Sequence, residues 1–275
     1  GGYLRAGTTV NSVGVALNHL PALLAAGASP APSLYLPQSI GPLRGPVGWA
    51  IRRALRRVDV VCARDDRTVS DLAGLPNVHR IPDLAVLELA DRLPDLSDEP
   101  LEGPVVLVGR RVDGPRADGA ARSLRRLGDE LEATWAVQAD VGGARSDARF
   151  YEELGVGPRP SLREVLASSP RGVVVSVRLH GALQALLAGW PAIHLSYQRK
   201  GWAAYGDLGL GALVHSAFDV PEAAVLDQVR SLRAGREPFW ELIHARRPEL
   251  VAASRSLDRL LLATITPRPQ GPRAH

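Results

Sequence analysis

Residues 172–181 read GVVVSVRLHG, and this stretch decides the fold class. Four valines interrupted by one serine form a run without polar alternation, which is typical of a strand buried on both faces of a parallel sheet. We predict a strand over residues 172–177, then Arg178-Leu179-His180-Gly181, and then a helix over residues 182–188. A buried strand followed at once by a helix is the repeating step of an α/β fold.

The same alternation extends from this stretch toward both ends of the chain. We predict further strands at 33–38, 58–63, 78–81, 105–109, 134–139 and 191–197. We predict helices at 11–27, after Pro42, from about Arg67, and at 118–132, 221–233 and 239–262, the last with a break at Pro248. Residues 39–42, at the end of the first of these strands, predict a turn.

The pattern falls into two series, separated by residues 93–104, which are rich in proline and acids and carry no periodicity. We therefore expect two Rossmann-like domains that face each other across a cleft. The expected boundaries are an N-terminal domain over 1–95, which we take as the acceptor side, a linker over 96–104, a C-terminal domain over 105–263 and a disordered tail over 264–275. The chain has no methionine and opens on Gly1-Gly2, so we expect the start of the first domain to be missing.

Composition excludes several classes of protein. The 275 residues are 45% hydrophobic and 23% charged, which is typical of a globular protein and not of a disordered one. The single cysteine, Cys62, excludes a disulfide framework, and its apolar strand predicts a small core residue. The histidines show no spacing typical of metal ligands, so we expect no metal. We find no signal segment and no spanning helix, and we expect the protein in the cytoplasm.

Charge gives a weaker signal, because 33 basic residues are interleaved with 29 acidic ones. No aromatic platform or finger motif accompanies the arginines, so we expect no nucleic-acid partner. One cluster, Arg52-Arg53 with Arg56-Arg57, lies on a predicted helix. A solvated helix face explains it, and so does peripheral contact with an anionic glycan lipid or with the inner face of the membrane.

Candidate chemistry in the second series lies beyond the ends of the strands, where open α/β sheets bind ligands. Arg178 can bind a carboxylate or a phosphate through two hydrogen bonds, and His180 can exchange a proton near neutral pH. Lys200, the only lysine in the sequence, follows the next strand. These three side chains predict an anion pocket with a proton donor. The alternatives are that Arg178 pairs with a buried acid, that His180 caps the helix, and that Lys200 is a surface residue.

The strands of the first series end at Gln38-Ser39, at Arg64-Asp65 and at Asp83. Gln38 and Ser39 could bind sugar hydroxyls or only form the turn. Arg64 with Asp65 could clamp a ligand, or Asp65 could serve as a helix N-cap.

Several of these motifs resemble the polysaccharide pyruvyl transferase family in order and spacing. They are VSVRLHG at 175–181, Tyr197 with Lys200, DLG at 207–209, LPQSIGP at 36–42, ARD at 63–65 and PD at 82–83. The resemblance covers roughly residues 1–215. It implies a GT-B-like fold of two Rossmann-type domains. It also implies transfer of the enolpyruvyl group of phosphoenolpyruvate to paired sugar hydroxyls, which leaves a pyruvate ketal and releases phosphate.

The resemblance further implies roles for individual residues. Arg178 and His180 are the catalytic pair at phosphoenolpyruvate, with His180 as the acid that protonates its methylene carbon. The substrate-binding residues are Leu179, Gly181, Lys200, Tyr197, Arg64, Gln38, Ser39, Gly1 and Gly2. Phosphoenolpyruvate is the donor substrate and no cofactor is needed. The acceptor is a glycan or lipid-linked sugar of the cell envelope, a capsule or an exopolysaccharide. The alternatives are a glycosyltransferase that uses nucleotide sugars and an inactive member that binds glycans.

Overall fold

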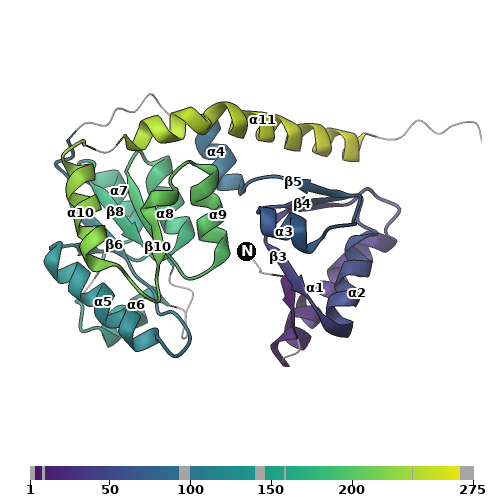
Figure 1. Cartoon of the computed structure of the whole chain (residues 1–275), viewed down its shortest axis with the longest axis horizontal. Helices are drawn as coiled ribbons and strands as arrows, with labels where there is room; N and C mark the ends of the chain where they lie inside the picture. The colour runs from purple at the N-terminus through teal and green to yellow at the C-terminus, as the bar shows by residue number, and fades with distance from the viewer. Residues whose placement is uncertain are drawn as a thin grey trace, which may run out of the picture. The chain divides into compact units, whose positions relative to one another are not determined.

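The computed structural model describes residues 4–7, 10–92, 100–139, 146–157, 159–236 and 238–266. The chain divides into two compact units, each of which is a parallel α/β structure (Figure 1). Unit 1 comprises residues 1–87 and 249–275, and unit 2 comprises residues 88–248. Residues 96–99 of the predicted linker and residues 267–275 of the predicted tail lie outside the described residues.

Unit 1 contains two parallel sheets. Its strands are β1 (Leu4–Ala6), β2 (Leu34–Gln38), β3 (Ile40–Leu43), β4 (Val60–Ala63) and β5 (Val78–Arg80), and its helices are α1 (Val10–Ala28), α2 (Gly45–Leu55), α3 (Asp66–Asp71) and the first part of α4 (Leu84–Arg92). Strand β1 pairs with β3, and a second sheet has the order β2-β4-β5.

The predicted turn at 39–42 is wrong, because β3 occupies most of it. Leu4 of β1 lies in register with Ile40 of β3, and both side chains are fully buried in one core cluster. Burial of this apolar pair makes the segment a strand despite its glycine and proline.

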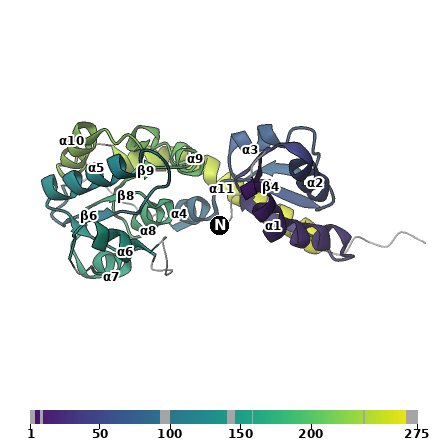
Figure 2. The same cartoon turned by 90° about the horizontal axis from the view of Figure 1, so that it is seen from below.

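Unit 2 contains one five-stranded parallel sheet. Its strands are β6 (Val105–Val108), β7 (Thr134–Trp135), β8 (Val173–Ser176), β9 (Ala192–Ser196) and β10 (Val214–Ser216), in the order β10-β9-β8-β6-β7. Its helices are α5 (Ala117–Glu130), α6 (Asp147–Glu153), α7 (Leu162–Ser168), α8 (Leu179–Leu187), α9 (Arg199–Asp207), α10 (Glu222–Arg233) and the first part of α11 (Phe239–Ile265). Figure 2 shows α5 and α10 on one face of this sheet and α7 and α8 on the other. Strand β8 lies between β6 and β9, so its carboxyl end borders the ends of both neighbours.

Helix α11 differs from the prediction in two respects. It continues through Pro248, so the predicted break there is wrong. Ile243 and Leu250 are buried on either side of the proline, and this packing offsets the hydrogen bond that a proline removes. The last part of α11 also belongs to unit 1, where Leu257 packs in one core cluster with Cys62, the buried core residue that the sequence predicted.

Helices α8 and α9 of unit 2 also differ from the prediction. Helix α8 begins at Leu179, three residues before the predicted start, because Leu179 is buried and extends the apolar face of the helix. Helix α9 was not predicted, since Gly201 and Gly206 lower its intrinsic helix propensity. Its buried Tyr205, whose hydroxyl donates to the Ala192 carbonyl at 3.0 Å, supplies packing that propensity does not measure.

Candidate active site

The candidate site lies at the carboxyl edge of the unit 2 sheet, where β8 ends and α8 begins. Arg178 is the N-cap residue of α8 and His180 lies in the first turn of this helix. The hydroxyl of Ser176 donates to the Arg178 carbonyl at 2.8 Å, and the Arg178 N–H donates back to this hydroxyl at 3.2 Å. A Cβ added to Gly181 would meet the Ser176 hydroxyl at 2.8 Å, so the helix can approach the strand end this closely only at a glycine.

Strand β9 ends in a turn with the same hydrogen bond as the turn after β8. The Ser196 hydroxyl donates to the Gln198 carbonyl at 2.7 Å, and a Cβ added to Gly201 would collide with this hydroxyl. The spacing from serine to glycine is the same as in the turn after β8, so Lys200 and His180 occupy equivalent positions in the first turns of α9 and α8. Because β8 and β9 are neighbours, the two helices begin side by side, and the free N–H groups at both starts favour an anion.

Arg178 is oriented by an acid that the sequence analysis missed. Its Nε lies 2.6 Å and 2.9 Å from the two carboxylate oxygens of Asp147, which is fully buried in the first turn of α6. The Asp147 carboxylate also accepts the backbone N–H of Gln138 at 3.2 Å and of Ala139 at 3.0 Å. The alternative that Arg178 pairs with a buried acid is thus confirmed, while its contact with a ligand stays a prediction. The pair fixes the guanidinium at the edge of the sheet, 14% exposed.

A second arginine was also missed. Arg110 follows β6, and its Nη1 donates to the Tyr197 hydroxyl at 2.6 Å while its guanidinium carbon lies 4.6 Å from the centre of the Tyr197 ring. Because β8 lies between β6 and β9, this contact passes across the end of β8. The rule that ligands bind at strand ends could have found Arg110, but one arginine after a strand carries little signal in a chain with 33 basic residues.

A buried histidine on β9 forms a hydrogen bond with the end of β8. His194 is 1% exposed, and its Nδ1 donates to the Ser176 carbonyl at 2.9 Å. Burial lowers the pKa of His194 to about 4; the hydrogen bond to Ser176 opposes this shift, and the positive charge of Lys200 adds to it. The imidazole is therefore neutral near pH 7, and the positive charge at this edge comes from the arginines and Lys200.

The structure places the predicted unit 2 residues at the ends of two neighbouring strands, β8 and β9. Tyr197 and Lys200 are half-buried, and His180 is exposed. Leu179 is 3% exposed and packs into the core, so its side chain positions the helix start. Within the described residues, no group of three or more His, Cys, Asp and Glu side chains is placed to hold a metal ion.

The predicted unit 1 residues form a different arrangement. Arg64 Nη1 contacts the Asp83 carboxylate at 2.6 Å, and Arg64 Nε donates to the Ser39 hydroxyl at 3.2 Å. The Ser39 hydroxyl donates to Asp65 at 2.5 Å, and Asp65 accepts the Thr68 N–H at 2.7 Å. All five side chains are nearly or fully buried, and the N-cap interpretation of Asp65 is confirmed.

Of the remaining unit 1 candidates, the structure describes Gln38. Gln38 is half-buried, and its backbone carbonyl accepts the Arg64 N–H at 3.0 Å. Gly1 and Gly2 lie outside the described residues. Ligand binding by Arg64, Ser39 and Gln38 stays a prediction.

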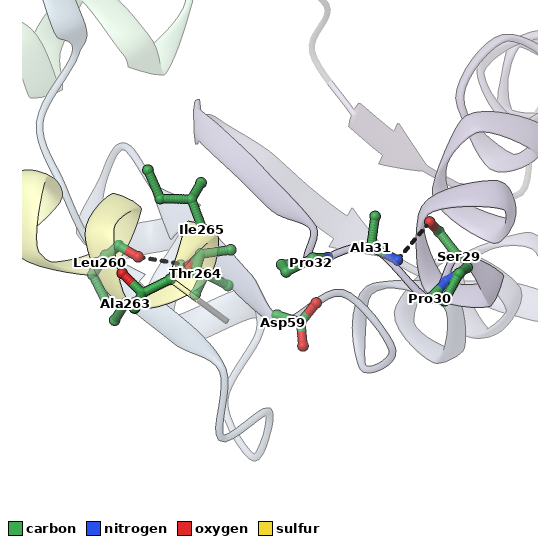
Figure 3. Close-up of a pocket in the computed structure, with 11 residues that line it drawn as sticks. Ser29, Pro30, Ala31, Pro32, Asp59, Leu260, Ala263, Thr264 and Ile265 are labelled. Carbon is green, nitrogen blue, oxygen red and sulfur yellow. Dashed lines mark hydrogen bonds between the residues drawn. The ribbon is translucent and has the colours of Figure 1, made fainter. Parts of the chain in front are cut away.

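A cavity of about 610 Å³ in unit 1 is separate from all of these residues (Figure 3). It lies between the turn after α1 and the last turns of α11, and its polar side chains are Ser29, Asp59, Thr264 and Thr266. The Asp59 carboxylate accepts the Ser33 N–H at 2.8 Å, and the Ser29 hydroxyl accepts the Ala31 N–H at 3.0 Å. None of the predicted site residues lines this cavity, so volume alone does not identify the candidate site.

Comparison with known proteins gives one family match. The family model described as polysaccharide pyruvyl transferase matches residues 6–199. No curated protein sequence matches the chain. No described helix has the length and apolar character that crossing a membrane requires.

Solved structures resemble the chain in fold. A UDP-forming trehalose-phosphate synthase from Burkholderia xenovorans aligns with a TM-score of 0.52 and 15% identity, over 96% of this chain and 72% of that one. A UGT transferase from Siraitia grosvenorii in complex with UDP has a TM-score of 0.45 and 16% identity over 80% of this chain, which spans 63% of the length of that protein. The predicted GT-B-like α/β fold is thereby confirmed.

Proposed function

The chain belongs to the polysaccharide pyruvyl transferase family, and we propose that it transfers the enolpyruvyl group of phosphoenolpyruvate to sugar hydroxyls. The acceptor would be a glycan or lipid-linked precursor of a cell-envelope or capsular polysaccharide, and the product a pyruvate ketal. The observation that supports this most is the gathering of Arg110, Arg178 and Lys200 at three neighbouring strand ends.

The charge of the donor fits this edge of the sheet. Phosphoenolpyruvate carries a carboxylate and a phosphate on one small carbon frame, so it needs several cations close together. Arg178 is held in one orientation by Asp147, and Arg110 is held over the Tyr197 ring. Two fixed guanidinium groups lose little conformational entropy when they bind an anion. The N-termini of α8 and α9 add N–H donors and the positive ends of two helix dipoles.

His180 is the proton donor in this scheme. It protonates the methylene carbon of phosphoenolpyruvate, which leaves an oxocarbenium-like C2, and the first sugar hydroxyl attacks C2 and gives its proton back to His180. The C2–O bond to phosphate then breaks, and phosphate leaves with the bonding electron pair. The second hydroxyl adds to C2 and loses its proton to the departing phosphate, which closes the ketal. Cations on the donor stabilise the growing negative charge of phosphate, and no metal or organic cofactor takes part.

Calorimetric titration of the chain with phosphoenolpyruvate tests the donor, with UDP-glucose titrated in parallel. Phosphoenolpyruvate should bind, and Arg110→Gln should weaken it about tenfold or more, because a charge-assisted contact contributes ~1.5–3 kcal/mol. Arg163→Gln is the matched control, since Arg163 is an exposed arginine on α7. Binding of UDP-glucose without phosphoenolpyruvate would contradict the proposal and favour a nucleotide-sugar donor. Equal losses in both variants would show that net charge alone matters.

A further inference from the structure

Helix α2 of unit 1 presents an exposed tryptophan among arginines. Trp49 is 65% exposed, and the guanidinium carbon of Arg53 lies 5.8 Å from the centre of its ring. Arg56 and Arg57, directly after the helix, are exposed as well. We call these four residues the Trp49 face.

The arginines of the Trp49 face differ in their pairing from those of α5. Within the described parts of the chain, Arg53, Arg56 and Arg57 form no ion pair with an acidic side chain. On α5, by contrast, Arg125 pairs with Asp129 at 3.0 Å and Arg126 pairs with Glu222 at 2.5 Å. Arg52 is not counted in the Trp49 face. Its side chain donates to the backbone carbonyls of Asp71 and Ala73 and so attaches α2 to the segment after α3.

The sequence before this face is free of acids, and the first acid after it is Asp59, two residues beyond Arg57. Residues 1–58 contain six arginines and neither aspartate nor glutamate, so all 29 acidic residues of the chain lie in residues 59–275. Positive potential around the Trp49 face is therefore not cancelled by acids from the same segment, and it attracts anionic surfaces over the range of a Debye length.

The neighbouring helix adds apolar surface without charge. Helix α1 contains no Asp, Glu, Lys or Arg, and its Leu17 and Leu24 are 70% and 47% exposed. The two helices pack side by side, as Figure 1 shows, and a Cβ added to Gly27 of α1 would meet the Arg57 Cβ at 2.7 Å. A hollow of about 230 Å³ lined by Trp49, Arg52, Arg53 and Arg56 lies on α2 itself.

We propose that the Trp49 face binds the surface of an anionic lipid bilayer. Arginine side chains contact lipid phosphates, and Trp49 enters the interfacial region, where tryptophan is favoured because one end of its ring system is apolar and the other is polar. This surface lies in unit 1 and uses none of the donor residues of unit 2. It would hold the chain at the membrane where a lipid-linked acceptor resides, a role separate from the proposed transfer.

Co-sedimentation with vesicles tests this proposal on the whole chain. Vesicles of phosphatidylcholine with phosphatidylglycerol should bind the chain, and vesicles of phosphatidylcholine alone should bind it far less. The triple variant Arg53→Gln/Arg56→Gln/Arg57→Gln should lower the partition coefficient on the order of 100-fold, at about fivefold for each arginine. Trp49→Ala should also lower the partition coefficient. This loss should remain at high salt, where the charge contribution is screened.

The matched control is Arg116→Gln/Arg163→Gln/Arg236→Gln, which removes the same charge from exposed arginines of unit 2. Retained binding in this control, with loss in the first triple variant, supports the proposal. An equal loss of vesicle binding in the two triple variants would overturn the proposal, because it would show that only the net charge of the chain matters. A folded parent chain that does not bind anionic vesicles would also overturn the proposal.

If the parent forms a dimer and the Arg53/Arg56/Arg57 variant is a monomer, the Trp49 face binds a second copy of the chain and not a bilayer. Thermal unfolding of each variant identifies any loss that comes from misfolding.

Discussion

Both units end their parallel strands in charged residues, but those of unit 1 are buried, while several of those of unit 2 reach solvent. In unit 1, Arg64 is matched by Asp83 and surrounded by Ser39 and Asp65, and none of the four is more than 6% exposed. Such a network has its hydrogen bonds satisfied from within, and its main effect is on stability.

In unit 2 the basic residues at the strand ends reach solvent. Asp147 pairs with Arg178, while Arg110 lies against Tyr197 and Lys200 lies in the next helix start. Arg110 and Lys200 are half-buried and not sealed from solvent. A charged residue at a strand end is therefore the stronger ligand candidate where solvent can reach it, as at Arg110 and Lys200.

The largest expected effect is a loss of stability in unit 1. Arg64→Ala leaves the buried Asp83 carboxylate without its partner, and it should lower the free energy of unfolding by about 3–5 kcal/mol. Urea unfolding followed by circular dichroism measures this. The double variant Arg64→Met/Asp83→Leu is the control and should recover most of the loss, because it removes both charges. A loss below about 1 kcal/mol in the single variant would show that the network is open to solvent.

Acid should destabilise unit 2 through His194. Its pKa of about 4 in the folded protein lies below the 6.5 of an unfolded histidine, so the unfolded state binds more protons between these values. The contribution is complete above pH 6.5 and is lost as the pH falls toward 4, by about 3 kcal/mol in total. Urea unfolding at several pH values should show this slope, and His194→Asn should flatten it. An unchanged slope in the variant would assign the acid sensitivity to other groups.

A smaller effect is expected where α9 meets β9. Gly201→Ala places a methyl group against His194 and Ser196, so the helix start must shift, at about 1–3 kcal/mol of stability. Lys200 moves with the helix, and the affinity for phosphoenolpyruvate should fall in calorimetry. Gly206→Ala is the matched control, because nothing lies within 4 Å of a Cβ at Gly206. If both variants bind the donor like the parent, the start of α9 has no part in the site.

The sequence was sufficient to place Arg178, His180 and Lys200 together, because strand periodicity and the rule for parallel sheets need only local information. It could not reveal Asp147, which lies 31 residues from Arg178 and meets it only through tertiary packing. The same limit explains unit 1: the sequence shows Arg64 beside Asp65, but the partner that neutralises Arg64 is Asp83, on another strand end. Local spacing predicts which edge a side chain occupies and not which charges are cancelled there.

The smallest expected effect concerns Gln38 in unit 1. Gln38→Ala should change the free energy of unfolding by no more than about 0.5 kcal/mol, because the side chain is half-buried outside the Arg64 network. Donor affinity should stay at the parent value, while the KM for a glycan acceptor should rise if Gln38 binds sugar hydroxyls. A loss of affinity for phosphoenolpyruvate would show that the end of β2 also contributes to donor binding. The two units would then not differ in this respect.

The most direct test of the account is the stabilisation that phosphoenolpyruvate gives to the chain during urea unfolding. At 100 times its dissociation constant the ligand should add about 2.7 kcal/mol to the parent and to Arg163→Ala. Arg178→Ala should gain nothing over its own ligand-free baseline, although that baseline is itself lowered by the unpaired Asp147. A gain in Arg178→Ala equal to that of the parent, or no gain in a folded parent, would contradict a donor site at the strand ends of unit 2.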